Sequence, residues 1–309
     1  MQYRRLGDSE LHVSEICLGT WTTFGGSLDE DAAHELVDAA FELGVNFFDT
    51  ANIYGGGRSE ETLGRTLAAR PRDSYVLATK LRGNAPDGGT GVSREQVLHQ
   101  IDRSLERLGA EFVDLYQCHW WDEDVPLAET LEAMTELVEA GKVRYVGCSN
   151  WSGEQIRQAV DLAHEGGYVK IVSSQPEYSL LHREPEADVI PASATNGVSQ
   201  IVYSPLAEGV LTGKYLPGEA AAEGTRASAR GEWMEFLEDG VLERVRRLRP
   251  IADGLGLTMP QLALAWILRE PNVASAIVGA SRPGQLRDNA AASGVRLDDG
   301  TLRAIAEAM

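Results

Sequence analysis

Residues 44–64 read GVNFFDTANIYGGGRSEETLG and combine a short apolar run, a polar turn and a helix-period segment. The run 45–49 has the length and the aromatic content of a buried strand, and 58–68 spaces its apolar residues as an amphipathic helix does. The chain repeats this strand-then-helix unit along most of its length. We therefore expect an α/β protein with parallel strands.

The repeated unit defines the fold class. Expected strands lie at 15–20, 45–49, 75–80, 113–119, 143–148, 171–175, 200–204 and 275–279. Expected helices lie at 29–43, 58–68, 93–108, 126–140, 152–164, 186–195, about 241–254 and about 260–269. Eight such strands predict a single (β/α)8 TIM barrel that spans 1–309 as one domain. The opening segment 1–14 is predicted to form a hairpin that caps the barrel floor.

Four side chains with related chemistry stand at the ends of three consecutive expected strands: Asp49, Tyr54, Lys80 and His119. The carboxyl ends of parallel barrel strands open on one face, so these side chains are expected to converge there. A carboxylate keeps the lysine charged, and the lysine should lower the pKa of the tyrosine toward neutrality. The tyrosine can then donate a proton to a reacting oxygen that a neutral histidine orients.

Each of these residues also fits a structural role when taken alone. His119 resembles a hydrogen-bonded core histidine, Lys80 a lysine whose stem covers apolar surface, and Tyr54 a loop tyrosine. Their joint occurrence in this order favours catalysis.

The order Asp, Tyr, Lys, His resembles the catalytic tetrad of the aldo-keto reductases. The segment 44–64 carries the family's signature, and the likeness runs from YRRLGDSELHVSEICLGTW near the start to IVGASRPGQLRDNAAA near the end. Within the family the chain is most similar to the branch that contains the potassium-channel β subunits and their bacterial reductase relatives.

The resemblance implies NADPH or NADP+ as cofactor. Ser149, Asn150 and Gln175 would bind the nicotinamide carboxamide, and Tyr203 would stack on the ring. The phosphates would lie near a donor-rich turn, the long loop and the start of the last barrel helix. The full expected cofactor set is Thr20, Trp21, Asp49, Ser149, Asn150, Gln175, Tyr203, Ser204, Pro205, Leu206, Gly209, Lys214, Arg226, Gly279, Ser281, Arg282, Gln285, Asp288 and Asn289.

Three positions depart from the pattern of many family members. Gly279 and Gln285 replace a lysine and an arginine, and Asp288 replaces a glutamate. The β-subunit-like branch also lacks the two cations, so NADPH remains the expected cofactor. The glycine-rich stretch 55–64 has Glu60 where a Rossmann fingerprint needs a glycine, so the dinucleotide must bind in another way.

The resemblance implies reduction of aldehydes or ketones to alcohols, with Tyr54 as proton donor and no metal. Trp21, Tyr54, His119, Trp120 and Trp151 are the expected walls of the substrate pocket. Trp233, in the long loop, would reach over the site. The alternative is an NADP(H)-sensing regulatory subunit with slow catalysis. The segment before YRRLG is shorter than an inactivating peptide requires, which favours a free enzyme.

One interval is longer than the others. From about 202 to 277 the spacing between strands roughly doubles. The added residues are small, polar and rich in glycine around 211–240. The resemblance implies a loop that folds over the cofactor, and an irregular surface excursion is the alternative.

Composition restricts the partners and the compartment. The 28 Lys and Arg against 47 Asp and Glu give a net charge of −19 without a basic stripe, which argues against a nucleic-acid partner. No apolar run is long enough for a signal peptide or a membrane span, so a cytoplasmic protein without a membrane partner is expected. Cys17, Cys118 and Cys148 are expected to be buried free thiols. The sequence leaves open the physiological substrate, the preferred direction and whether the protein is a monomer or a homo-oligomer.

Overall fold

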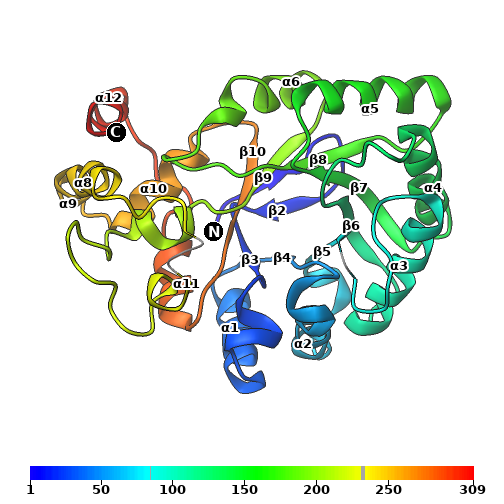
Figure 1. Ribbon diagram of the computed structural model, residues 1–309, viewed down its shortest axis with the longest axis horizontal. Helices are drawn as coiled ribbons and strands as arrows, with labels where there is room; N and C mark the ends of the chain where they lie inside the picture. Colours follow the sequence, from blue (N-terminus) through cyan, green and yellow to red (C-terminus); the bar gives the residue numbers. More distant parts are fainter. Residues whose placement is uncertain (84, 231–233) are drawn as a thin grey trace.

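Eight parallel strands close into a barrel in the computed structural model, which describes residues 1–83, 85–230 and 234–309 (Figure 1). The order around the barrel is β10-β3-β4-β5-β6-β7-β8-β9. The strands are β3 (Ile16–Gly19), β4 (Phe47–Asp49), β5 (Val76–Leu81), β6 (Val113–Cys118), β7 (Val143–Ser149), β8 (Ile171–Gln175), β9 (Ser199–Val202) and β10 (Val273–Val278). The predicted (β/α)8 barrel is confirmed, and each strand overlaps its expected range.

Helices surround the barrel. They are α1 (Glu30–Glu42), α2 (Arg58–Leu67), α3 (Arg94–Leu108), α4 (Leu127–Glu139), α5 (Gly153–Gly166), α6 (Val189–Thr195), α7 (Arg226–Arg230), α8 (Asp239–Arg247), α9 (Arg249–Gly254), α10 (Met259–Leu268), α11 (Pro283–Ala290) and α12 (Asp299–Ala308). Local sequence explains several starts. Ser93 accepts a hydrogen bond from the Gln96 backbone N–H at the start of α3, and Ser152 and Gln155 form a capping box at the start of α5.

Two of the expected helices differ in the structure. The single helix expected over 241–254 is divided into α8 and α9, because Pro250 lacks a backbone N–H and its ring disfavours a continuous helix. The helix expected at 186–195 begins only at Val189 and follows a 3-10 turn over Glu184–Glu186. The sequence reading also missed α12, a short helix that begins after the cap residue Asp298.

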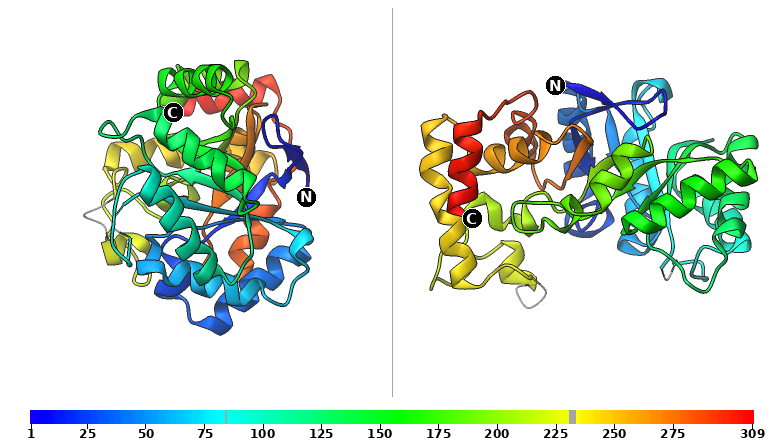
Figure 2. Two further views of the ribbon diagram at one scale, coloured as in Figure 1. Left: turned by 90° about the vertical axis from the view of Figure 1, so that its right-hand side faces the viewer. Right: turned by 90° about the horizontal axis from the view of Figure 1, so that it is seen from above.

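The amino-terminal hairpin closes one end of the barrel. Its strands β1 (Tyr3–Arg5) and β2 (His12–Ser14) pair antiparallel. Leu6, Leu11 and Val13 join the cluster of apolar side chains inside the barrel, together with Phe47 and Leu115. The hairpin and the long segment that contains α7 lie at opposite ends of the molecule (Figure 2). The predicted floor cap is confirmed, and the other end is left for the site.

The three cysteines lie on barrel strands and are buried and unpaired. Cys17 is on β3, and Cys118 and Cys148 are register neighbours on β6 and β7. Burial raises the pKa of each thiol, that of Cys118 to about 12. The prediction of buried free thiols is confirmed.

Within the described ranges, no single helix is long and apolar enough to cross a bilayer. The segments Asp239–Gly254 and Met259–Leu268 reach that composition only when joined, and they are bent by 89° relative to one another. Met259 and the residues from Leu262 to Leu268 of α10 are buried against their neighbours in the protein.

Candidate active site

The four predicted catalytic side chains converge at the open end of the barrel. Asp49 is the last residue of β4, Lys80 is the penultimate residue of β5, and His119 directly follows β6. Tyr54 begins the 3-10 turn η2 (Tyr54–Gly57) that follows β4. Because β4, β5 and β6 are parallel neighbours, their carboxyl ends bring these residues to one place.

Lys80 is the centre of this group. Its fully buried ammonium donates to Asp49 Oδ1 at 2.6 Å and to the Thr50 carbonyl at 2.8 Å, and it lies 3.4 Å from the Tyr54 hydroxyl. Burial alone would lower the pKa of Lys80, but the charge of Asp49 and the contact with Tyr54 outweigh it and raise that pKa. The prediction that Asp49 keeps the lysine charged is confirmed.

The expected direction of the Tyr54 pKa is wrong. Burial raises the pKa of this phenol, and Asp49 adds to the increase. Lys80 lowers it, as expected, but by less than burial raises it. Tyr54 is therefore protonated at neutral pH and is ready to act as an acid. Its deprotonated form becomes available only in alkaline solution.

His119 is a neutral imidazole. Burial, followed by the nearby charges of Lys80 and Arg82, lowers its pKa from 6.5 to about 2. Its ring lies edge-on to that of Tyr54, with 5.8 Å between centroids, and stacks on Trp120 at 4.0 Å. Its buried Nδ1 has no hydrogen-bond partner among the described residues. The histidine can thus orient an oxygen beside Tyr54 without carrying charge.

Two glutamines hold the second oxygen of Asp49. The Gln175 amide donates to Asp49 Oδ2 at 3.0 Å, and the Gln117 amide lies 3.5 Å from the same oxygen. Because the Gln175 side-chain nitrogen donates to Asp49, only the side-chain carbonyl oxygen of Gln175 is available for the cofactor contact that was expected. Gln117 was missed by the sequence reading. Its place two residues before His119 on β6 was the available signal, since alternate strand residues face the same side.

Ser149, the last residue of β7, forms a connected polar arc with Asn150, which follows β7, and Tyr203, which follows β9. Tyr203 donates to Asn150 Oδ1 at 2.9 Å, and Asn150 donates to the His119 carbonyl and to Ser149 Oγ, both at 3.1 Å. Asn150 has a φ of 57°, a left-handed conformation that is unusual for a residue other than glycine. The arc joins the expected cofactor residues to the backbone of His119.

The turn after β9 has the same unusual backbone. Ser204, Ala207 and Glu208 have φ values of 50°, 45° and 58°. Such strain persists where surrounding contacts enforce it, and it is common at functional sites. Among the other expected residues of this turn, Pro205 and Leu206 come just before the 3-10 segment η5 (Ala207–Thr212), Gly209 lies within it and Lys214 lies just beyond it.

Arg226, on α7 in the long segment, lies beside two residues of the barrel end. Its guanidinium pairs with the Glu208 carboxylate at 2.6 Å and lies 4.8 Å above the Trp21 ring. Trp21 follows β3, so this contact brings the long segment next to the connection after β3. Glu208 was not expected from the sequence. Its carboxylate neutralises a cation that the resemblance assigned to the cofactor.

Some of the cofactor residues expected after β10 form side-chain hydrogen bonds with other residues, whereas others are exposed. Gln285 accepts from the Ser281 backbone N–H at 2.8 Å and from its hydroxyl at 3.0 Å. Arg282 is exposed and precedes α11, and Gly279 has open space where a side chain would begin. Asp288 instead accepts from Thr258 Oγ1 at 3.0 Å and from Gln261 Nε2 at 2.7 Å, so it serves the start of α10.

The other expected cofactor residues are buried. Thr20 donates to the Asp49 carbonyl at 3.2 Å, and Asn289 is buried within α11. Thr20 therefore helps to fix the backbone of Asp49.

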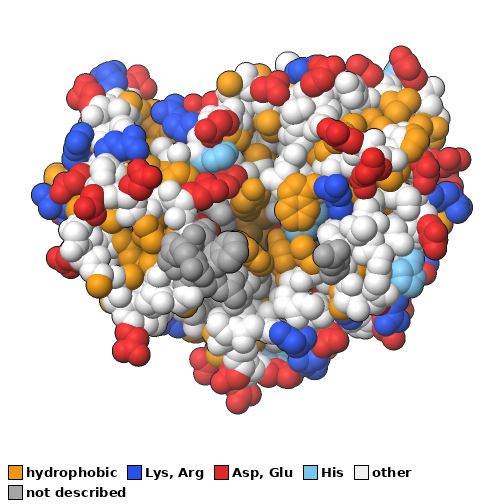
Figure 3. Space-filling model, in the orientation of Figure 1, with side chains coloured by type: hydrophobic (Ala, Val, Ile, Leu, Met, Phe, Trp, Pro, Cys, Tyr) orange, Lys and Arg blue, Asp and Glu red, His pale blue; other side chains and the backbone are white. Residues whose placement is uncertain are grey.

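The expected pocket walls fall into two groups. Trp21 and Trp120 are 47% and 40% exposed, and hydrophobic side chains gather around a hollow on the face that Figure 3 shows. Trp151 is only 4% exposed and packs edge-on against Trp121 at 4.8 Å between centroids. Trp151 is thus packed inside the protein rather than exposed on this face, and its neighbour Trp121 was not predicted from the sequence. Trp233 lies outside the described residues.

Comparisons with known proteins agree with the barrel fold. The family model described as the Aldo/keto reductase family matches residues 15–309. A rice (Oryza sativa subsp. japonica) protein named "Probable voltage-gated potassium channel subunit beta" is 40% identical over 297 residues, which covers 94% of this chain and 90% of the relative. A protein of the same name from Arabidopsis thaliana is 39% identical over 296 residues, with the same coverage. Both the family model and these relatives extend over nearly the whole chain, which therefore belongs to the aldo/keto reductase family.

Proposed function

We propose that this protein reduces aldehydes or ketones to alcohols with NADPH. The observation that carries the proposal is the position of Lys80 Nζ, 2.6 Å from Asp49 and 3.4 Å from the Tyr54 hydroxyl, beside a neutral histidine. A protonated phenol next to a fixed positive charge can give its proton to a carbonyl oxygen as negative charge develops there. Membership of the aldo/keto reductase family supports an oxidoreductase.

The residues at the barrel end fit a dinucleotide phosphate. No carboxylate among the described residues lies within 4.0 Å of Lys214 or Arg282, although the chain as a whole is strongly acidic. The buried Oε2 of Glu208 accepts no hydrogen bond from the described residues. A ribose hydroxyl of the cofactor could donate one to it. Ser149 and Asn150 supply polar groups beside His119, and Tyr203 supplies an aromatic ring.

Each catalytic residue then has a stated task. A bound nicotinamide cofactor supplies the hydride that the carbonyl carbon accepts. Tyr54 donates its hydroxyl proton to the carbonyl oxygen, and Lys80 stabilises the phenolate that remains. His119 orients that oxygen by a neutral hydrogen bond, and Asp49 keeps Lys80 charged and in place. The raised pKa of Tyr54 favours reduction near neutral pH, because the reverse reaction requires the phenolate.

The exposed rings of Trp21 and Trp120 define the proposed substrate class. They flank Tyr54 and His119, with 6.4 Å between the Trp21 and Tyr54 centroids and direct stacking of Trp120 on His119. Aromatic walls of this kind favour apolar or aromatic carbonyl compounds. A panel of such compounds, assayed by NADPH oxidation alongside a Tyr54→Phe control, tests the proposal. NADPH oxidation that is equal in the two proteins would refute it.

The relatives support a second candidate, a regulatory subunit that binds NADP(H) and turns over slowly. Both are named as potassium channel β subunits and match 94% of the chain. The same panel separates the two functions. Tight NADPH binding without turnover above the Tyr54→Phe background on any carbonyl would favour the regulatory role, whereas rapid turnover would favour the enzyme. Measuring the oligomeric state in the same samples shows how many subunits form the species that turns over or binds NADPH.

A further inference from the structure

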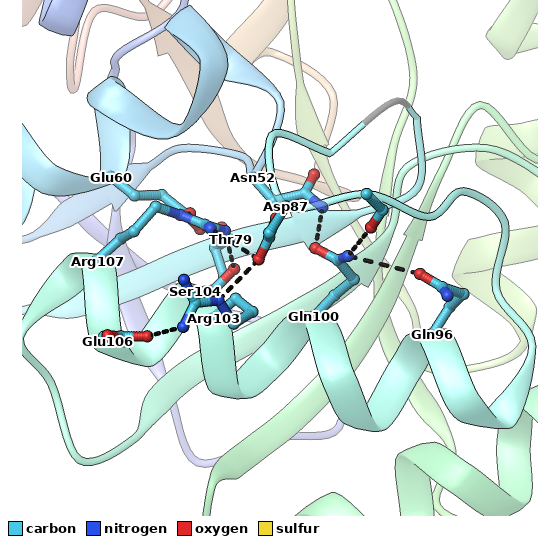
Figure 4. Close-up of polar contacts among 11 residues, drawn as sticks. Asn52, Glu60, Thr79, Asp87, Gln96, Gln100, Arg103, Ser104, Glu106 and Arg107 are labelled. Carbon is cyan, nitrogen blue, oxygen red and sulfur yellow. Dashed lines mark hydrogen bonds and ion pairs between the residues drawn. The ribbon is translucent and has the colours of Figure 1, made fainter.

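A network of charged and polar side chains joins β5, α2 and α3 next to the strand that carries Lys80 (Figure 4). The Glu60 side chain, in the first turn of α2, is completely buried. Its Oε1 accepts from Thr79 Oγ1 at 2.6 Å, and its Oε2 accepts from Arg107 Nε on α3 at 2.7 Å. Neither contact involves a residue to which the proposed mechanism gives a task.

The Glu60–Thr79 hydrogen bond joins the two segments that carry the proton-donating pair. Thr79 immediately precedes Lys80 on β5, and strand alternation directs Thr79 outward to the helices and Lys80 into the barrel. Glu60 follows Tyr54 by one short turn and the beginning of α2. A shift at this hydrogen bond therefore displaces α2, together with the Tyr54 turn, relative to Lys80.

A second connection runs parallel to the first. The Asn52 backbone N–H donates to the Lys80 carbonyl at 3.2 Å, and the Asn52 amide donates to Gln100 Oε1 on α3 at 3.1 Å. Gln100 in turn donates to the Gly88 carbonyl at 3.0 Å. Hydrogen bonds of Asn52, before the tyrosine, and of Glu60, after it, thus attach the Tyr54 segment to β5 and to α3.

Because the Glu60 carboxylate is buried, it must keep both of its hydrogen-bond partners. A buried carboxylate that loses a partner is strongly destabilised, because water cannot replace the lost hydrogen bond. Arg107 is itself held by Asp87 at 3.3 Å, and Asp87 also binds Arg103 at 2.9 Å. With Arg107 fixed in this way, Glu60 and Thr79 have little freedom to move apart without disturbing the rest of the network.

We propose that Glu60 and Thr79 are positioning residues, which set the Tyr54 hydroxyl relative to the Lys80 ammonium. The inference rests on the proposed function, because it states that the Glu60–Thr79 hydrogen bond supports proton donation by Tyr54. Neither residue touches the substrate. Their effect reaches the reaction through the distance between Tyr54 and Lys80.

Thr79→Val tests the inference, since it removes the hydroxyl and leaves the shape nearly unchanged. Thr66→Val is the matched control, because Thr66 is also buried on α2 but its hydroxyl donates only to Leu63 of the same helix at 2.8 Å. We expect kcat to fall about tenfold or more in Thr79→Val, since small misplacements of catalytic groups have effects of that order. The dissociation constant for NADPH should not change. Thr79→Ser, which restores the hydroxyl, should recover kcat.

A second measurement does not depend on turnover. The titration of Tyr54 can be followed by NMR of 13Cζ-labelled tyrosine and assigned by comparison with Tyr54→Phe. Its pKa should rise in Thr79→Val, because Lys80 lowers that pKa less from a greater distance, and should stay unchanged in Thr66→Val. Equal values of kcat and of the Tyr54 pKa in the two valine variants would overturn the inference. A wild-type protein without carbonyl reduction would instead overturn the proposed function, and the NMR comparison would still decide whether the network positions Tyr54.

Discussion

His119 should make the folded protein sensitive to acid by an amount that can be calculated. Its pKa falls from 6.5 to about 2 on folding, first because of burial and then because of Lys80 and Arg82. Below about pH 6.5 the unfolded chain binds a proton on this side chain and the folded chain does not. The stabilisation from neutral His119 is thus complete above pH 6.5 and is lost progressively toward pH 2, by about 1.4 kcal/mol per pH unit.

Between pH 7.5 and 4.5 this linkage amounts to about 3 kcal/mol in the free energy of unfolding. His119→Asn removes the titrating group, so its stability should fall less than that of the wild type, by about this amount, over the same interval. Urea unfolding followed by tryptophan fluorescence at both pH values gives the difference, and all other titrating groups cancel. His99→Asn, on the exposed face of α3, is the matched control and should follow the wild type.

An identical pH dependence in wild type and His119→Asn would refute the reasoning. It would mean that the folded protein accepts a proton on His119 as readily as the unfolded chain does. The assignment of a neutral imidazole to orient the carbonyl oxygen would then lose its basis.

Three further substitutions test the site. Tyr54→Phe should reduce kcat by about 10²–10⁴ and leave NADPH affinity, measured by tryptophan quenching, nearly unchanged, because only the proton donor is lost. Lys80→Met should lower the rate and move the basic limb of the reduction pH profile upward, since Lys80 lowers the pKa of Tyr54; an unmoved limb would uncouple the two. Arg282→Ala should weaken NADPH by about 1.5–3 kcal/mol and barely affect NADH in equilibrium titrations, whereas equal losses would remove the 2′-phosphate assignment.

The barrel was predictable because its signal is local. Each apolar run, such as 171–175 for β8, contains in itself the composition of a buried strand, and parallel order then places Asp49, Lys80 and His119 together. The boundary between α8 and α9 was missed although Pro250 was visible, because the helix period continues across it. Local patterns were therefore enough to predict the barrel framework and to bring the candidate catalytic residues to one end of it.

The partners of those residues were not predictable in the same way. Gln175 is 126 positions from Asp49, and nothing in either neighbourhood indicates that its amide binds that carboxylate. The pKa of Tyr54 depends on how much water the folded site excludes, and burial outweighs the one charge that the sequence suggested. Such effects arise only when distant segments pack, as do Arg226 and Glu208.

The buried thiols of β3, β6 and β7 can be used as native probes of local unfolding of the barrel wall. Only a thiolate reacts readily with a disulfide reagent, and these three sulfur atoms are both shielded from solvent and hard to deprotonate. Modification must therefore wait until the surrounding strands separate. Variants that retain one cysteine at a time would report, through their labelling rates, the free energy at which each part of the wall opens. The chain carries its own probes of local unfolding, without any engineered label.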